Sequence, residues 1–232
     1  MKNKTFLHPA VVFFFLTLLV AFFSWVGNIY GWTGVQSLFG AEGLRWFFRS
    51  VKDNFLQSPV LGDVLILLPS LGLFLHTGLG NIIRCRLALK NNFSRKEKRA
   101  CTAAVVALVL YIITVSLLAW GPVLRNVTGS LFHSPFSEGF SFMLSLGIAL
   151  VAIVYGYASD AYRTICNVVE GMAYGFKYFA GYLITLLFAV LFFNVFYYTG
   201  LASLWIKSPE VFNVLYATCC LLPLLYKDTY CK

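Results

Sequence analysis

The sequence has few charged residues for its length. Asp, Glu, Lys and Arg make up 12% of its 232 residues, whereas 59% are hydrophobic. A soluble domain carries about 25% charged residues, so this composition predicts an integral membrane protein. The formal net charge is +9, but the basic residues are gathered in short segments. They do not form the long basic surface of a nucleic-acid-binding protein, and we expect no nucleic-acid partner.

The motifs of enzymes and metal sites are also missing. The three histidines, His8, His76 and His133, lie in different segments, and none of the six cysteines forms a CxxC pair. The sequence contains no phosphate-binding glycine loop, no nucleophile elbow and no HExxH motif. We therefore expect neither an enzyme nor a bound metal or cofactor.

What the sequence does contain is a series of long apolar runs, most of them long enough to cross a bilayer as helices. They predict an all-α fold: a single membrane domain over residues 1–232, a polytopic helical bundle with about six transmembrane helices. The spans are expected near residues 9–30, 61–83, 103–120, 140–157, 178–198 and 211–225. No cleavage site follows the first run, so we read it as an uncleaved span rather than a signal peptide. The last run is short, and a re-entrant or partial segment is the alternative.

A different kind of helix is expected over residues 37–56. Leu44, Phe47 and Val51 recur at helical spacing, with polar and basic residues on the other face. Ser37 is the expected N-terminal cap. The pattern favours an amphipathic helix lying in the membrane interface, with the lipid bilayer as its partner. An ordinary extramembrane helix packed on its neighbours is the alternative.

The orientation in the membrane follows from one basic loop. Residues 84–100, between the second and third apolar runs, hold seven of the chain's 18 Lys and Arg residues. Short basic loops beside membrane helices stay in the cytoplasm. With this loop inside, 13 of the 18 basic residues fall on the cytoplasmic side and five on the outer side. The sequence therefore predicts that both termini are cytoplasmic.

Two blocks of sequence carry a family resemblance, and the tract over residues 35–46, which begins VQSL and ends EGLRW, is its most specific part. The blocks comprise residues 8–9, 35–38, 41–46 and 54–55, then 124–125, 128–131, 134–136, 168–172, 181–182 and 188–189. In these blocks the chain resembles the p-aminobenzoyl-glutamate transporter family of bacterial membrane proteins. It looks like a shortened relative that lacks the family's hairpin segments.

The resemblance implies secondary transport in the bacterial inner membrane, driven by an ion gradient. The implied substrate is a small anionic aromatic amide: the folate catabolite p-aminobenzoyl-glutamate, or a related antimetabolite. The implied assembly is a homodimer. Arg125 and Arg163 are cationic residues that could meet the carboxylates of such a substrate. Because the hairpins are missing, the alternative is a non-transporting membrane scaffold that dimerises or associates with a full-length paralogue.

Four residues are candidates for substrate binding. Asp63 begins the second span, where it either complements the helix dipole or lines an ion or substrate path. Asn194 lies deep in the fifth span, and its amide makes either a cross-helix hydrogen bond or a ligand contact. Tyr197 and Tyr198 end that span and read as interfacial anchors. The family resemblance aligns both tyrosines with a binding tract, which makes substrate contact the alternative.

Overall fold

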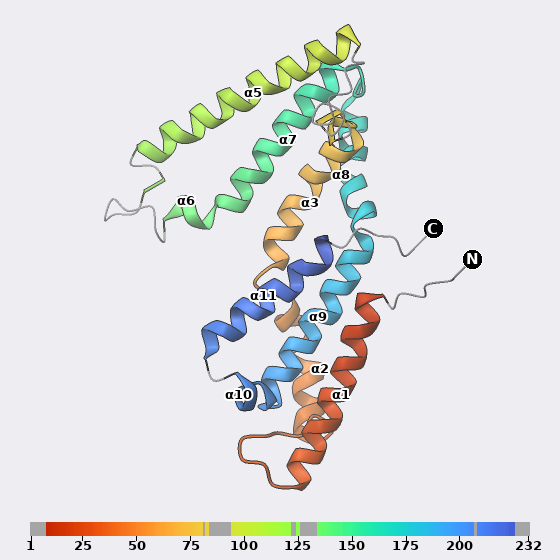
Figure 1. Ribbon diagram of the computed structural model, residues 1–232, viewed down its shortest axis with the longest axis vertical. Coiled ribbons are helices and arrows are strands. Elements are labelled where there is room, and N and C mark those ends of the chain that lie inside the picture. The colour runs from red at the N-terminus through yellow and green to blue at the C-terminus, as the bar shows by residue number, and fades with distance from the viewer. Residues whose placement is uncertain are drawn as a thin grey trace, which may run out of the picture. The chain divides into compact units, whose positions relative to one another are not determined.

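The computed structural model describes residues 8–80, 82–83, 94–121, 124–125, 134–206 and 208–225. These residues form helices joined by turns, without a strand, and the expected all-α fold is confirmed. The helices are α1 (Pro9–Ile29), α2 (Ala41–Leu56), α3 (Leu61–His76), α5 (Arg95–Trp120), α6 (Pro135–Glu138), α7 (Phe140–Ala158), α8 (Ile165–Tyr178), α9 (Ala180–Tyr198), α10 (Leu201–Trp205) and α11 (Pro209–Leu225) (Figure 1).

Among the described helices, α1, α5, α7 and α9 are long and apolar enough to cross a membrane. Helices α2 and α3, taken together as one broken span, would make a fifth. Helix α3 has 16 residues and α11 has 17, which is short for a span of their own. The chain is therefore a multi-pass membrane protein by length and composition, and the expected count of about six spans stays a prediction.

The chain divides into two compact units. Unit 1 joins residues 1–62 to residues 179–232, and unit 2 covers residues 63–178. Among the described residues, unit 1 has one buried cluster and unit 2 has two, and each unit is described by itself below. The single membrane domain expected from the sequence stays a prediction.

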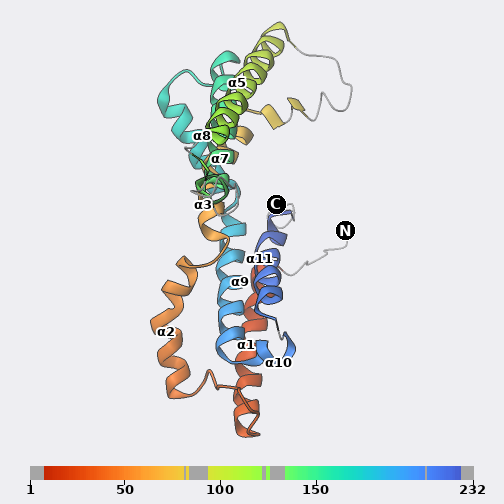
Figure 2. The same ribbon diagram turned by 90° about the vertical axis from the view of Figure 1, so that its left-hand side faces the viewer.

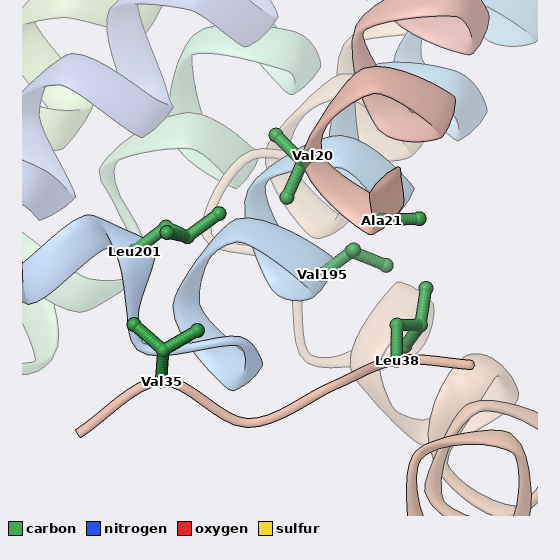
Figure 3. Close-up of a cluster of buried hydrophobic side chains, with 6 residues drawn as sticks. All are labelled: Val20, Ala21, Val35, Leu38, Val195 and Leu201. Carbon is green, nitrogen blue, oxygen red and sulfur yellow. The ribbon is translucent and has the colours of Figure 1, made fainter. Parts of the chain in front are cut away.

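Unit 1 is built on α1 and α9, which run side by side in the same direction (Figures 1 and 2). In the first half of both helices, the rings of Phe14 and Phe188 meet edge to face with centroids 5.8 Å apart. Farther along, the second half of both helices enters one buried cluster, completed by the segment before α2 and by α10. The cluster consists of Val20, Ala21, Val35, Leu38, Val195 and Leu201 (Figure 3). Contact between residues so far apart in sequence fixes the segment before α2 against the end of α9.

Helix α11 returns along α9 in the opposite direction. The Tyr182 hydroxyl donates a hydrogen bond to the Cys220 carbonyl over 3.1 Å, and Phe193 stacks on Tyr216 with centroids 4.9 Å apart. Between the two helices the chain turns at Gly200, whose φ of 74° lies in the left-handed region. A Cβ there would meet the carbonyl oxygen of Gly34, so only glycine fits this turn.

Unit 2 contains the antiparallel pair α5 and α7 (Figure 1). The Tyr111 hydroxyl of α5 donates to the Met143 carbonyl of α7 over 2.6 Å. Gly147 gives the Tyr111 ring its space, because a Cβ on Gly147 would stand 2.7 Å from that ring. Farther along, Ala104 packs in a cluster with Tyr155. Small residues on one helix thus receive aromatic rings from the other, which allows close helix packing.

Helices α3 and α8 approach still more closely through glycines. A Cβ on Gly72 would lie 2.5 Å from the backbone nitrogen of Gly175. Beside this contact, Tyr162 is 1% exposed and stacks on His76 with ring centroids 5.8 Å apart. The Tyr162 hydroxyl points at Gly171 and has no hydrogen-bond partner among the described atoms. Tyr162 therefore fills the space that Gly156 and Gly171 leave.

Helix α3 also contains Pro69, as the sequence indicates. Proline has no N–H, so the Leu65 carbonyl four residues earlier loses its helical partner, and the ring crowds this turn. In the same turn the Ile66 carbonyl accepts a hydrogen bond of 2.7 Å from the Ser145 hydroxyl of α7. A side chain 79 positions away in sequence thus ties α7 to the turn that the proline disturbs.

Several expected boundaries were wrong. The basic loop was expected to run to residue 100, but α5 already begins at Arg95, because Ser94 and Glu97 form a capping box. The second span was expected to reach residue 83, but α3 ends at His76, two residues before Gly78 with its left-handed φ of 72°. Residues 84–93 of the expected loop lie outside the described residues, as do both ends of the chain.

The start of the amphipathic helix was also misplaced. Helix α2 begins at Ala41 with Gly40 as its N-cap. Ser37 does not cap it, and the Ser37 hydroxyl is buried without a hydrogen-bond partner among the described atoms. Helix α8 forms in the polar connection that follows α7.

Candidate functional site

A polar groove of about 660 Å³ lies along α2 in unit 1. The six lining residues from α2 recur at helical spacing and so share one face of that helix. Tyr198 closes the groove from the end of α9, and Gln36 from the segment before α2. The lining residues are Gln36, Glu42, Arg45, Trp46, Arg49, Ser50, Asp53 and Tyr198.

The apolar wall of the groove is a pair of stacked rings. Trp46 and Tyr198 lie 3.9 Å apart between centroids with an interplanar angle of 12°. The pair is held in place because the Gln36 backbone N–H donates to the Thr199 carbonyl over 3.0 Å, next to Tyr198. Trp46 also packs against the buried cluster of unit 1. The stack is therefore a fixed flat surface beside open polar space.

The groove carries two charges of each sign. Arg45 and Arg49 are one helical turn apart and exposed, and Glu42 and Asp53 lie nearer the two ends of the same face. None of the four forms an ion pair with another described residue. A guanidinium group binds carboxylates through two parallel hydrogen bonds. The two arginines are therefore available for an anionic ligand, although the groove as a whole is formally neutral.

The structure places the predicted site residues on different sides of α9. Tyr198 lines the groove, whereas Tyr197 is 69% exposed and faces Phe212 of α11 at 5.6 Å between ring centroids. The Asn194 amide donates to the Val190 carbonyl of its own helix over 2.8 Å. Its neighbour across the helix contact is Tyr216, whose buried hydroxyl lacks a partner at hydrogen-bond distance. Only Tyr198 of these residues lines the groove.

Asp63 belongs to unit 2, where it lies exposed in the first turn of α3. That position suits the positive end of the helix dipole. Arg163 is exposed before α8, and the Arg125 Nε donates to the Ala119 carbonyl over 3.1 Å. Within the described ranges, no three His, Cys, Asp or Glu side chains come close enough to hold a metal ion.

The arginines of α2 were missed as candidates because the sequence reading assigned them to the polar face of an interfacial helix. Two signals could have found them. Arg45 and Arg49 stand four residues apart, on either side of Trp46, and Arg45 and Trp46 end the tract with the most specific family resemblance. The sequence alone does not show that Tyr198 stacks on Trp46.

Comparison with known proteins decides the family. The sequence profile of the AbgT putative transporter family matches residues 84–211, more than half of the chain. The chain belongs to the AbgT family. The match confirms the resemblance to p-aminobenzoyl-glutamate transporters. It covers α5 to α10 and hence Tyr198, whereas α2 with its arginines lies before it.

Two solved transporters share the fold of this AbgT family member. The YdaH transporter of Alcanivorax borkumensis matches with a TM-score of 0.73 at 16% identity, covering 94% of this chain and 83% of that chain. MtrF of Neisseria gonorrhoeae, described with a class of antimetabolite efflux pumps, matches with a TM-score of 0.69 at 16% identity, covering 96% and 80%. No curated protein matches the chain in sequence. Because its family is one of putative transporters, the AbgT family member is of a transporter type and not an enzyme.

Proposed function

We propose that the protein transports a small anionic aromatic amide of the p-aminobenzoyl-glutamate type, driven by an ion gradient, and that it binds this substrate in the groove along α2. One observation carries the proposal: Arg45 and Arg49 flank the ring that Tyr198 stacks upon. Membership in a transporter family supports the transport step.

The chemistry of such a substrate matches the groove part by part. Its carboxylates would pair with Arg45 and Arg49 through charge-assisted hydrogen bonds. Its aromatic ring would lie against the edge of the Trp46–Tyr198 stack, an arrangement that aromatic rings favour. The volume of about 660 Å³ lies within the range of small-molecule sites, about 300–1,000 Å³.

We further propose that the protein lies in the bacterial inner membrane with both termini in the cytoplasm. The parallel course of α1 and α9 supports the expected alternation of the spans, because both would then cross in the same direction. The antiparallel courses of α5 against α7 and of α9 against α11 fit the same alternation, and the cytoplasmic placement of the termini rests on the basic residues 84–100. Cys166 on α8 is exposed and would be cytoplasmic. A membrane-impermeant thiol reagent should label Cys166 in inside-out vesicles and spare it in intact cells.

Transport is tested by flux into liposomes that contain the purified full chain. We expect saturable uptake of p-aminobenzoyl-glutamate under an imposed proton or sodium gradient. The double variant R45Q/R49Q should raise the half-saturating concentration at least tenfold, because each lost charge-assisted hydrogen bond is worth about 1.5–3 kcal/mol. The matched control is R163Q, which neutralises an exposed arginine outside the groove and should leave uptake unchanged.

The outcomes separate the parts of the proposal. Uptake that R45Q/R49Q leaves unchanged would retain transport but place the substrate elsewhere. Absence of uptake by the chain alone, together with co-purification of a longer relative, would favour a non-transporting scaffold. The expected homodimer is checked in the same preparation by native mass spectrometry.

A further inference from the structure

The surface of the first half of α5 is basic at the start of the helix and apolar in the turns that follow. The helix has 26 residues and is therefore about 39 Å long, whereas the hydrocarbon core of a bilayer measures about 30 Å. Its first turns must extend into the head-group region. Only 6% of its most apolar 18-residue stretch is buried, so nearly the whole stretch is open to its surroundings. Figure 1 shows α5 along one side of unit 2.

A hollow of about 600 Å³ follows one side of this helix. It begins at Lys98 and Arg99 and ends at Leu110, about 18 Å farther along the helix, and the apolar stripe takes about 10 Å of that length. The small residues recur at a spacing of four and make a shallow floor with larger side chains at its edges. The stripe consists of Ala103, Val106, Ala107 and Leu110.

Of the charged side chains near the start of the hollow, some have a partner within the described residues and others do not. The Glu97 carboxylate accepts the Ser94 backbone N–H over 2.8 Å and so serves the helix cap. The Lys96 ammonium lies 3.1 Å from the Asp160 carboxylate. Lys98 and Arg99 are exposed and have no acidic partner within the part of the chain that the structure describes. Two cations without an acidic partner among the described residues therefore stand where the apolar stripe begins.

We infer that this hollow binds an anionic phospholipid, with the phosphate at Lys98 and Arg99 and an acyl chain along the stripe. The order of charge and apolar surface matches that of the lipid from head group to tail. A soluble anion would leave the stripe unused, and an apolar partner helix would leave both cations unpaired. Basic clusters at the ends of membrane helices attract the anionic lipids of the cytoplasmic leaflet, at about 1 kcal/mol per Lys or Arg.

The test is a lipid titration of the purified full chain, read by native mass spectrometry. Phosphatidylglycerol and phosphatidylcholine with identical acyl chains are compared, because only the first has a net negative charge. We expect tighter binding of phosphatidylglycerol. The double variant K98Q/R99Q should weaken that binding about 30-fold, which corresponds to two basic contacts. The variant A103W should weaken the binding of both lipids by filling the hollow.

Two matched controls isolate the site. K177Q removes an exposed basic residue at the end of α8, and I112W adds the same ring to an exposed position of α5 outside the hollow. Both should bind lipid as the wild type does, and the melting temperatures of all variants verify folding. Equal affinity of the wild type for the two lipids would refute the inference, as would equal losses in K177Q and K98Q/R99Q. A change of dimer fraction in A103W with unchanged lipid binding would reassign the hollow to a protein contact.

Discussion

The glycine contact between α3 and α8 leads to a sharp prediction about Gly175. A Cβ on Gly175 would overlap the Leu68 carbonyl oxygen of the facing helix. That oxygen belongs to the backbone and cannot rotate away, so Gly175→Ala must push the helices apart. Overpacking of this kind costs about 1–3 kcal/mol, and the rigid contact favours the upper end of that range.

The substitution also has a favourable part, since alanine is the better helix former by about 1 kcal/mol. The net loss for Gly175→Ala is therefore about 2 kcal/mol. For a chain of this size it corresponds to a melting temperature lower by about 4–8 °C. The measurement is thermal unfolding of the purified protein in detergent, followed by circular dichroism at helical wavelengths.

Gly62→Ala is the matched control, because a Cβ on Gly62 in the first turn of α3 meets nothing within 4 Å. This variant should melt at or slightly above the wild-type temperature. If Gly175→Ala melted as high as Gly62→Ala, the close approach of the two helix backbones would be wrong, and the reasoning about the glycines with it.

Three further substitutions test other contacts. Tyr162→Phe removes a buried hydroxyl without a partner, so it should stabilise the protein by about 1 kcal/mol. Burial raises the pKa of Tyr162 to about 12. As the pH rises, the Tyr162 hydroxyl therefore loses its proton later in the folded state than in the unfolded state, and the protein loses stability between about pH 10 and pH 12. Tyr162→Phe should lessen that loss, as measured by thermal unfolding at alkaline pH. Ser94→Ala removes the N-cap of α5 and should cost about 1 kcal/mol, whereas Thr at this position should restore most of it. Ser145→Ala removes the hydrogen bond to the Ile66 carbonyl beside Pro69 and should cost about 1 kcal/mol in the same melting assay, whereas Leu146→Ala, at an exposed neighbouring position, should cost less.

The sequence was sufficient to predict the class of fold and the rough extent of the long helices. An apolar run of bilayer length must satisfy its own backbone hydrogen bonds in lipid, and the α-helix does so within one segment. Ends of helices depend on single residues and were predicted less well. The capping box of Ser94 and Glu97 is present in the sequence but lies inside a run of basic residues. That run was interpreted as a loop because of its charge, so the start of α5 was predicted too late. The break after His76 depends on Gly78, a single residue with a left-handed φ inside an apolar run.

The candidate site shows a different limit. Tyr197 and Tyr198 are neighbours with the same side chain, and no local pattern distinguishes them. In the structure Tyr198 meets Trp46, whereas Tyr197 meets Phe212. That division depends on where α2 and α11 pack around α9, which is a long-range property. Family resemblance pointed to the tyrosines together, and the three-dimensional arrangement separated them.

The pairing of α1 with α9 has a consequence for how the protein is made. Phe14 and Phe188 are ring partners, so on the order of 170 residues must be synthesised between them. At about 5–20 residues per second, α1 waits roughly 10 to 35 seconds in the membrane before its neighbour arrives. Throughout that interval the Val20 and Ala21 side chains, which pack in one cluster with Val195 in the finished protein, face lipid or an insertion factor. A ribosome that stalls before α9 would leave an orphan first helix, a natural target for membrane quality-control proteases.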